Sequence, residues 1–324
     1  CDDDRPVPIS RDPDELIDAA IARDRRALAR LLSMVERGGS PARAVGAAAH
    51  SRGADPAYTV GLTGAPGAGK STLTSALVGQ MRARDDRVAV LAIDPSSPFS
   101  GGAILGDRVR MQTHSTDDDV FIRSMATRGH LGGLSLATPQ AVRALEATGW
   151  PWVVIETVGV GQIEVDIAGE ADTTVVVVNP GWGDSVQANK AGLLEIADVF
   201  VINKADRSGA DEAERDLRQM LELGGMREWW PPILHTVATD GSGIAELLAA
   251  ISDHRAHLES TGALEERRRR RRREELGEIL RARLELRVAG LLDGAEGTAV
   301  VARLVDRDID PYEAADALLG DDGV

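Results

Sequence analysis

Residues 64–71 form a glycine-rich segment that ends in a lysine and a serine. The segment reads GAPGAGKS and matches the pattern G-x-x-x-x-G-K-[ST] in full, between an apolar run and a helical pattern. Glycines let such a loop wrap a phosphate with its N–H groups pointing inward, and the following helix adds a favourable dipole. We expect Lys70 to reach the β- and γ-phosphates of a nucleotide and Ser71 to offer its hydroxyl to Mg²⁺. The predicted nucleotide contacts are Gly64, Ala65, Pro66, Gly67, Ala68, Gly69, Lys70, Ser71 and Thr72.

Three acidic residues are candidates for the metal site. Asp94 and Glu156 each end an apolar run that reads as a strand, and Glu156 begins the sequence Glu-Thr-Val-Gly where many GTPases carry Asp-x-x-Gly. Strand ends in such sheets converge on the ligand crevice, so both carboxylates are expected near the metal. Asp107 lies in a loop, where a metal ligand and a surface carboxylate fit equally. The predicted catalytic residues are Lys70, Asp94 and Glu156, and the predicted metal ligands are Ser71, Asp94, Asp107 and Glu156.

A second motif points to the base of the nucleotide. Asn203-Lys204-Ala205-Asp206 directly follows an apolar run and matches N-K-x-D, a signature of guanine recognition. The Asp206 carboxylate can accept from guanine N1–H and the 2-amino group, whereas adenine offers neither donor there, which favours GTP over ATP. Lys204 can lie along the base, and Asn203 can tie this loop to the phosphate loop. A further base-contacting loop is predicted at Val237, Ala238 and Thr239.

Lysine usage singles out one more position. Of 37 basic residues only Lys70, Lys190 and Lys204 are lysines, so these mark places where an arginine fork does not fit. Two of them fall within the nucleotide motifs. Lys190 is therefore a candidate functional residue, although an ordinary first-turn helix position also fits it.

The elements that must position these residues alternate between strand and helix. Short apolar runs predict strands buried on both faces of a parallel sheet, at 58–63, 87–93, 152–156, 173–178, 198–202 and 233–237. Helical patterns lie between most of them, at 71–84, 139–148, 189–195 and 211–223. The predicted fold is α/β, with a doubly wound, mostly parallel sheet of the P-loop NTPase kind.

Helical additions flank this domain at both ends. Residues 12–37 read as one amphipathic helix and residues 41–52 as a second. The tail carries seven consecutive arginines, Arg267–Arg273, in a long helix from Ala263, and a short helix follows at 311–319. Flanking glutamate pairs favour a solvated helix face for the arginines over an anionic partner surface. The predicted domains are 1–57, an N-terminal helical extension; 58–258, the P-loop domain; and 259–324, a C-terminal helical arm.

Composition excludes several classes of function. A net charge of −15 disfavours a general affinity for nucleic acid. No apolar run approaches the roughly 20 residues that span a bilayer, and the first residues do not resemble a signal peptide. A single cysteine allows no disulfide within the chain. A cytoplasmic protein without membrane contact is expected.

Four segments together resemble a known family. They are 94–102 (DPSSPFSGG), 105–108 (LGDR), 156–162 (ETVGVGQ) and 180–184 (PGWGD). With the nucleotide motifs they resemble the methylmalonyl-CoA mutase-associated GTPases, the MeaB family once named ArgK transport kinases, over about residues 14–260.

The resemblance implies a homodimeric GTPase of the SIMIBI class of P-loop proteins that binds GTP or GDP with Mg²⁺ and dimerises through the C-terminal arm. It implies a chaperone of an adenosylcobalamin-dependent acyl-CoA mutase, methylmalonyl-CoA mutase above all, which gates cofactor loading and protects or reactivates the mutase. It also assigns Asp94, Asp107 and Glu156 to the Mg²⁺ and switch machinery. Asp184, Gln187 and Lys190 would form an additional switch that couples the nucleotide state to the partner.

Slow intrinsic turnover is expected. Val160 stands where a water-orienting glutamine is usual, the role of Gln162 is open, and no arginine finger is evident.

Two other functions share the P-loop. A metallochaperone GTPase would need His or Cys clusters, whereas His254 and His257 read as a solvated pair. A small-molecule kinase would need a phosphoacceptor.

Overall fold

The computed structural model describes residues 10–94, 114, 116–126, 133–157, 171–181, 194–225 and 227–320. These residues fall into two compact units: the first ends at Arg272, and the second begins at Arg273. We describe each unit by itself.

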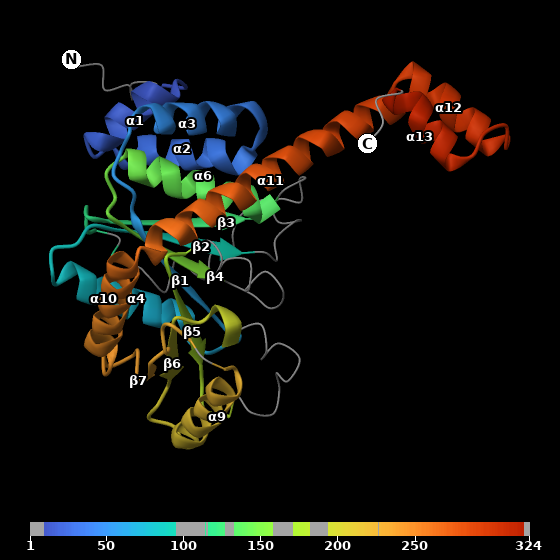
Figure 1. The fold of residues 1–324 in the computed structure, drawn as a ribbon. Coiled ribbons are helices and arrows are strands. Elements are labelled where there is room, and N and C mark those ends of the chain that lie inside the picture. Colours follow the sequence, from blue (N-terminus) through green and yellow to red (C-terminus); the bar gives the residue numbers. More distant parts are fainter. Residues whose placement is uncertain are drawn as a thin grey trace, which may run out of the picture. The chain divides into compact units, whose positions relative to one another are not determined.

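The first unit is built on a seven-stranded sheet in the order β3-β2-β4-β1-β5-β6-β7 (Figure 1). All strand pairs are parallel. The strands are β1 (Tyr58–Gly64), β2 (Val88–Asp94), β3 (Val120–Ala126), β4 (Trp152–Thr157), β5 (Thr173–Val178), β6 (Val199–Asn203) and β7 (Ile233–Thr236). Every residue of β1, β4, β5 and β6 is buried, as expected of apolar strands covered on both faces. The six predicted strands are confirmed, each within one residue of the observed ends.

Strand β3 was not predicted. Arg123 and Ser124 interrupt its apolar pattern, and it lies at the edge of the sheet, where polar side chains are tolerated. The Arg123 guanidinium pairs with Glu36 and donates to Ser33 Oγ at 3.0 Å. The charge that weakens the local strand signal is thus neutralised by a residue 87 positions away.

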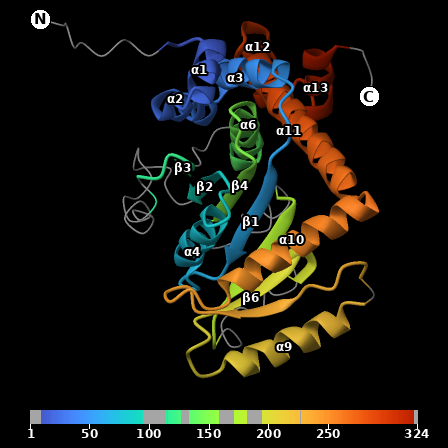
Figure 2. The ribbon, with the colours of Figure 1, turned by 90° about the vertical axis from the view of Figure 1, so that its left-hand side faces the viewer.

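Helices cover both faces of the sheet, which makes the fold doubly wound as predicted (Figure 2). On one face α4 (Lys70–Arg82) and α10 (Ile244–Thr261) pack against β1, β4 and β5. On the other, α6 (Gly133–Ala147) and the N-terminal helices share a core with β2 and β4. Helix α9 (Ala210–Leu223) packs on β6 and β7. Helix α6 begins six residues before Pro139, the predicted start, so that this proline lies inside it.

The predicted single helix over 12–37 is wrong: two helices occupy this stretch. They are α1 (Pro13–Ile21) and α2 (Arg25–Arg37). Arg23 adopts φ +71° and breaks the first helix, and the Asp24 carboxylate caps the second by accepting from Arg26 N at 2.8 Å. The side chain of Arg25 donates to the carbonyl oxygens of Asp117, before β3, and of Val120, the first residue of β3, which holds the break against the sheet edge. Helix α3 (Gly39–Ser51) matches the second predicted helix.

The C-terminal part is helical. It contains α11 (Ala263–Asp293), α12 (Ala295–Val305) and α13 (Pro311–Leu319), and α12 packs against α13. The predictions of α11 and α13 are confirmed. Helix α12 was not predicted.

The predicted solvated face is wrong for part of the arginine run. Arg267 pairs with Asp198 at 2.8 Å, and Arg268 pairs with Asp172 at 2.8 Å. Arg271 also pairs with Asp172, which is 1% exposed. Burial alone raises the pKa of Asp172, but these guanidinium groups outweigh it and hold the pKa below its usual value. The start of α11 is therefore fastened to the amino-terminal edge of the sheet, where Asp172 and Asp198 precede β5 and β6.

His254 is also not solvated. It is fully buried on α10, its Nδ1 lies 2.8 Å from Thr173 Oγ1, and its ring lies against Trp229. Burial lowers its pKa to about 4. His257 is half-buried, and the centre of its ring lies 5.1 Å from that of Trp229. The pair serves packing, and within the described residues no group of His, Cys, Asp or Glu is arranged to hold a metal.

Candidate functional site

The predicted site residues gather at the carboxyl ends of neighbouring strands. Strand β1 ends at Gly64 and leads through residues 65–69 into α4. Strand β4 lies beside β1 with Leu62 opposite Glu156, and β2 lies beside β4 with Ala92 opposite Glu156. In parallel α/β sheets this edge is where ligands bind.

Two glycines of the phosphate loop are required by close contacts. Gly64 has φ +136°, and a Cβ there would lie 1.9 Å from the carbonyl oxygen of Val177 on β5. Gly69 has φ +92°, and a Cβ there would lie 2.5 Å from Asn203 Nδ2. An added Cβ would meet the backbone of β5 at Gly64 and the Asn203 side chain at Gly69, and both positive φ values disfavour a residue with a Cβ.

Lys70 is the first residue of α4 and is 7% exposed. Its ammonium donates to the carbonyl oxygens of Gly64 at 2.5 Å and Ala65 at 3.3 Å. The ammonium group is therefore held inside the curve of the phosphate loop by two backbone carbonyl groups. It is placed to exchange these carbonyls for phosphate oxygens.

Ser71 and Glu156 form the centre of the predicted metal site. The Ser71 hydroxyl donates to Glu156 Oε1 at 2.5 Å, although the two residues are 85 positions apart. Glu156 is 1% exposed and lies in the sheet beside β1. A hydroxyl and a carboxylate at this separation are the oxygen donors that Mg²⁺ prefers. Asp94 ends β2 next to β4, and Asp107 lies outside the described residues.

The guanine loop is joined to the phosphate loop through Asn203, as the sequence analysis predicted. Asn203 Nδ2 donates to the Ala68 carbonyl at 2.8 Å. Its Oδ1 accepts from Thr236 Oγ1 and from Ala238 N, each at 3.2 Å. One buried amide thus fixes the phosphate loop, β6 and the loop after β7 with respect to one another. The hydrogen bond from Thr236 to Asn203 was not predicted, because no motif in the sequence around β7 indicates that this hydroxyl lies beside Asn203.

Lys204 and Asp206 follow the asparagine. Lys204 has φ +59°, a conformation that few non-glycine residues adopt, and its ammonium donates to the Gly67 carbonyl at 2.6 Å. Its stem therefore spans the gap between the two loops. The Asp206 side chain is exposed. Among the predicted loop residues after β7, Val237 and Ala238 are half-buried and Thr239 is exposed.

The predicted additional switch falls on a part of the chain that the structure does not describe. Asp184, Gln187 and Lys190 lie outside the described residues, as do Val160 and Gln162. Thr72 lies half-buried in the first turn of α4. Within the described ranges, no helix is both long and apolar enough to cross a membrane.

Comparison with known sequences gives a consistent result. The sequence profile of the family described as methylmalonyl-CoA mutase-associated GTPase MeaB matches residues 28–291. A protein of Pyrococcus abyssi that is named as a GTPase is 50% identical over 310 residues, covering 94% of this chain and 95% of that protein. GTPase ArgK of Escherichia coli is 39% identical over 218 residues, 64% of each chain. The fused isobutyryl-CoA mutase of Cupriavidus metallidurans is 37% identical over 227 residues, 69% of this chain and 20% of that protein.

Comparison with solved structures agrees. The crystal structure of an LAO/AO transport system kinase is similar with a TM-score of 0.69 at 25% identity, covering 97% of this chain and 98% of that one.

Proposed function

Because this chain belongs to the family of methylmalonyl-CoA mutase-associated GTPases and is therefore a GTPase, we propose that it uses GTP binding and hydrolysis to control an adenosylcobalamin-dependent acyl-CoA mutase. In this proposal it gates cofactor loading and protects or reactivates the mutase, with methylmalonyl-CoA mutase the first candidate. The mutase partner is supported by the relative named as a fused isobutyryl-CoA mutase, which contains a segment similar to this chain.

The nucleotide site in this proposal consists of two loops and the acids behind them. The loop N–H groups and Lys70 enclose the phosphates, Asp206 selects guanine, and residues 237–239 complete the base pocket. Ser71, Asp94, Asp107 and Glu156 would hold Mg²⁺, which when bound neutralises charge on the β- and γ-phosphates. The observation that carries this assignment is the Asn203 amide, which joins the phosphate loop to the guanine loop.

Hydrolysis follows from the same arrangement. Water attacks the γ-phosphate in line, and the charge that develops on its oxygens is stabilised by Lys70 and the loop N–H groups. We expect slow intrinsic turnover that the partner accelerates, and Asp184, Gln187 and Lys190 are the proposed link to that partner. Intrinsic turnover at about tens per second would contradict a switch.

The homodimer in this proposal forms through the C-terminal arm, the proposed domain at 259–324. Leu276, Leu280 and Leu284 recur every four residues on α11 and are 56%, 51% and 58% exposed. A row of exposed leucines on one helix face is typical of an interface. The other proposed domains are the helical extension at 1–57 and the GTPase domain at 58–258.

The experiment that tests the function is capture of the mutase. The protein is immobilised and loaded with GDP or with a non-hydrolysable GTP analogue. It should retain a purified adenosylcobalamin-dependent acyl-CoA mutase from the same organism, and the amount of mutase retained should differ between the two nucleotide states. The Lys70→Ala variant is the control, because it should lose the difference between the states. Equal retention, or none, in both states would overturn the proposal.

The same preparation separates the two alternative functions. A small-molecule kinase would transfer the γ-phosphate to an amino acid or another small acceptor, whereas a GTPase releases it into solution. A metallochaperone would carry stoichiometric nickel or zinc after purification. Phosphate release in the absence of any acceptor, with no bound transition metal, is the expected result.

A further inference from the structure

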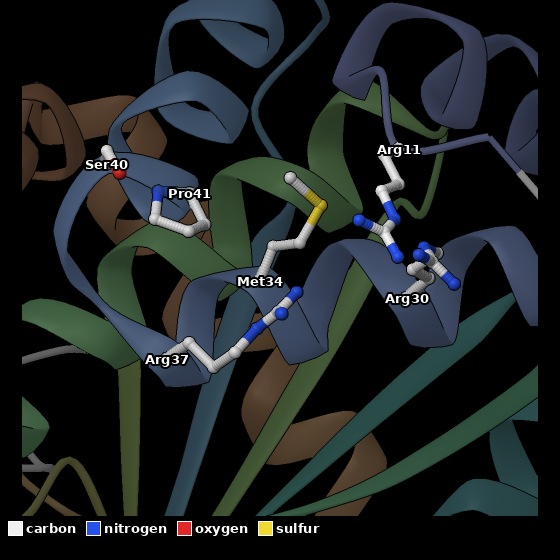
Figure 3. A pocket seen from close by; sticks show the side chains of 6 residues that line it. All are labelled: Arg11, Arg30, Met34, Arg37, Ser40 and Pro41. Carbon is white, nitrogen blue, oxygen red and sulfur yellow. The ribbon is translucent and has the colours of Figure 1, made fainter.

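A hollow of about 420 Å³ lies in the N-terminal helical layer, between the second half of α2 and the start of α3 (Figure 3). Its lining residues are Arg11, Arg30, Met34, Arg37, Ser40 and Pro41. None of them belongs to the phosphate loop or the guanine loop. The hollow is therefore separate from the nucleotide site.

Positive charge is concentrated in this hollow. Three of the six lining residues are arginines and none is acidic, in a chain whose net charge is −15. The Arg11 and Arg30 side chains lie on one side of the hollow, and the Arg37 side chain extends toward the same space (Figure 3). Like charges gathered in this way repel one another unless an anion lies between them.

The described part of the chain supplies no such anion. None of the three arginines forms a salt bridge with any described residue. The acidic residue before Arg37, Glu36, is already paired with Arg123 on β3. Among the described residues, the charges in the hollow thus have no salt-bridge partner, in contrast to those of Arg267, Arg268 and Arg271 at the start of α11.

Arg30 is half-buried. Its Nε is shielded from solvent and has no hydrogen-bond acceptor among the described residues. Arg37 Nε donates to the Ser33 carbonyl at 3.2 Å, which orients its fork and leaves the terminal N–H groups available.

We propose that this hollow binds a small molecule that carries a phosphate group. Arginine forks match the geometry of phosphate oxygens, and several forks around one centre suit a dianion better than a single carboxylate. The Ser40 hydroxyl adds a neutral donor, and Met34 and Pro41 form an apolar wall for the organic part. The volume lies in the ordinary range for small-molecule sites, roughly 300–1,000 Å³.

The test uses the full chain saturated with a non-hydrolysable GTP analogue and Mg²⁺, so that the phosphate loop is filled. Phenyl phosphate and inorganic phosphate are the probes, and ligand-observed NMR measures their binding. We expect both to bind, phenyl phosphate more tightly. The Arg11→Gln, Arg37→Gln double variant should weaken binding by about tenfold or more. Arg43→Gln, an exposed arginine of α3 that does not line the hollow, should leave it unchanged.

Three results would overturn the proposal: absence of probe binding to the wild type, equal binding by the double variant, or an equal loss in Arg43→Gln. Unchanged affinity for the GTP analogue verifies that the variants are folded. A second measurement needs no variants: phenylglyoxal labels the arginines of the wild-type protein with and without phenyl phosphate. Phenyl phosphate should protect Arg11 and Arg37 from the reagent. Equal labelling of these two arginines with and without phenyl phosphate would also contradict the proposed site.

Discussion

At the scale of single residues, the site depends on a few side chains that each serve two loops. Asn203 is 2% exposed and bonds to the phosphate loop and to the loop after β7. Lys204 bonds to Gly67 across the same gap. These contacts between protein groups fix the two loops with respect to one another. Pre-arranged polar groups discriminate between ligands better than groups that must be ordered on binding.

Asp206→Asn should weaken GDP binding by about 10²-fold or more, because the amide cannot accept both guanine donors. The affinity for ATP should change little, so the preference for guanine falls. Isothermal titration calorimetry with both nucleotides measures this ratio. Asp211→Asn, an exposed position on α9, should leave it unchanged. An unaltered GDP affinity in the Asp206 variant would show that another residue reads the base.

His254 should make the protein less stable in mild acid. Burial lowers its pKa to about 4 from an ordinary value of 6.5, so the folded state binds fewer protons than the unfolded state. Its contribution is complete above pH 6.5 and is lost as the pH falls toward 4, by about 3 kcal/mol in total. Urea unfolding of wild type and His254→Gln across this range should show a flatter pH dependence in the variant. The exposed His50 provides the control, since His50→Gln should keep the wild-type slope.

At the scale of elements, the phosphate loop is shaped by its neighbours as much as by its own sequence. Strand β5 approaches β1 so closely at Gly64 that no side chain fits between them. Helix α4 then begins at Lys70, directly after Gly69 in its left-handed conformation. The motif therefore positions Lys70 only when β1 and β5 are paired.

Gly64→Ala should destabilise the protein by about 4 kcal/mol or more, because its Cβ would meet the Val177 carbonyl oxygen. Gly67→Ala is the matched control in the same loop. Its φ of +74° is also positive, but no atom lies within 4 Å of the added Cβ, so about 1–2 kcal/mol is expected. Thermal unfolding of both variants measures the difference, and equal losses would mean that the contact with β5 is not tight.

At the scale of the whole molecule, charge pairs fasten the start of α11 to the sheet edge opposite the nucleotide loops. The buried Asp172 carboxylate pairs with the guanidinium groups of Arg268 and Arg271, and the buried Asp198 carboxylate pairs with that of Arg267. Such pairs are costly to break from one side, because a buried carboxylate then remains without compensation. The arginine run thus divides into residues that face the sheet and residues that face solvent.

Replacing Arg268 and Arg271 together by glutamine should destabilise the first unit by about 3–5 kcal/mol, since Asp172 stays buried. The matched control replaces Arg269 and Arg272, which are exposed members of the same run, and should cost less than about 1 kcal/mol. Chemical denaturation measures both. Similar losses in the two double variants would indicate a general charge effect.

Replacing Leu276, Leu280 and Leu284 by glutamine should convert the proposed dimer into monomers while GDP affinity is retained, because the leucines lose their apolar contact. Light scattering after size-exclusion chromatography reports the mass. Glu278→Gln with Glu285→Gln changes polar positions on the opposite side of the same helix and should leave the dimer intact. A monomeric wild type would remove the dimer from the proposal.

The sequence by itself determined the features that depend on local chemistry. The phosphate loop, the guanine motif and six of the seven strands were predictable, because a motif with its flanking apolar runs is contained in a short stretch of chain. Burial on both faces was not predictable for β7, which lies at the sheet edge with three of its four residues half-buried. The link from Asn203 to the phosphate loop was also predictable, since both motifs follow parallel strands and so meet at one edge of the sheet.

Tertiary structure alone decided the features that join distant residues. Edge strand β3, the break between α1 and α2, the burial of His254 and the pairing of Arg268 with Asp172 all depend on partners far along the chain. The hollow lined by Arg11, Arg30 and Arg37 arises in the same way, from the packing of α2 and α3. A charge in a sequence carries no mark of its partner, and only the folded chain brings the two within a hydrogen-bond distance.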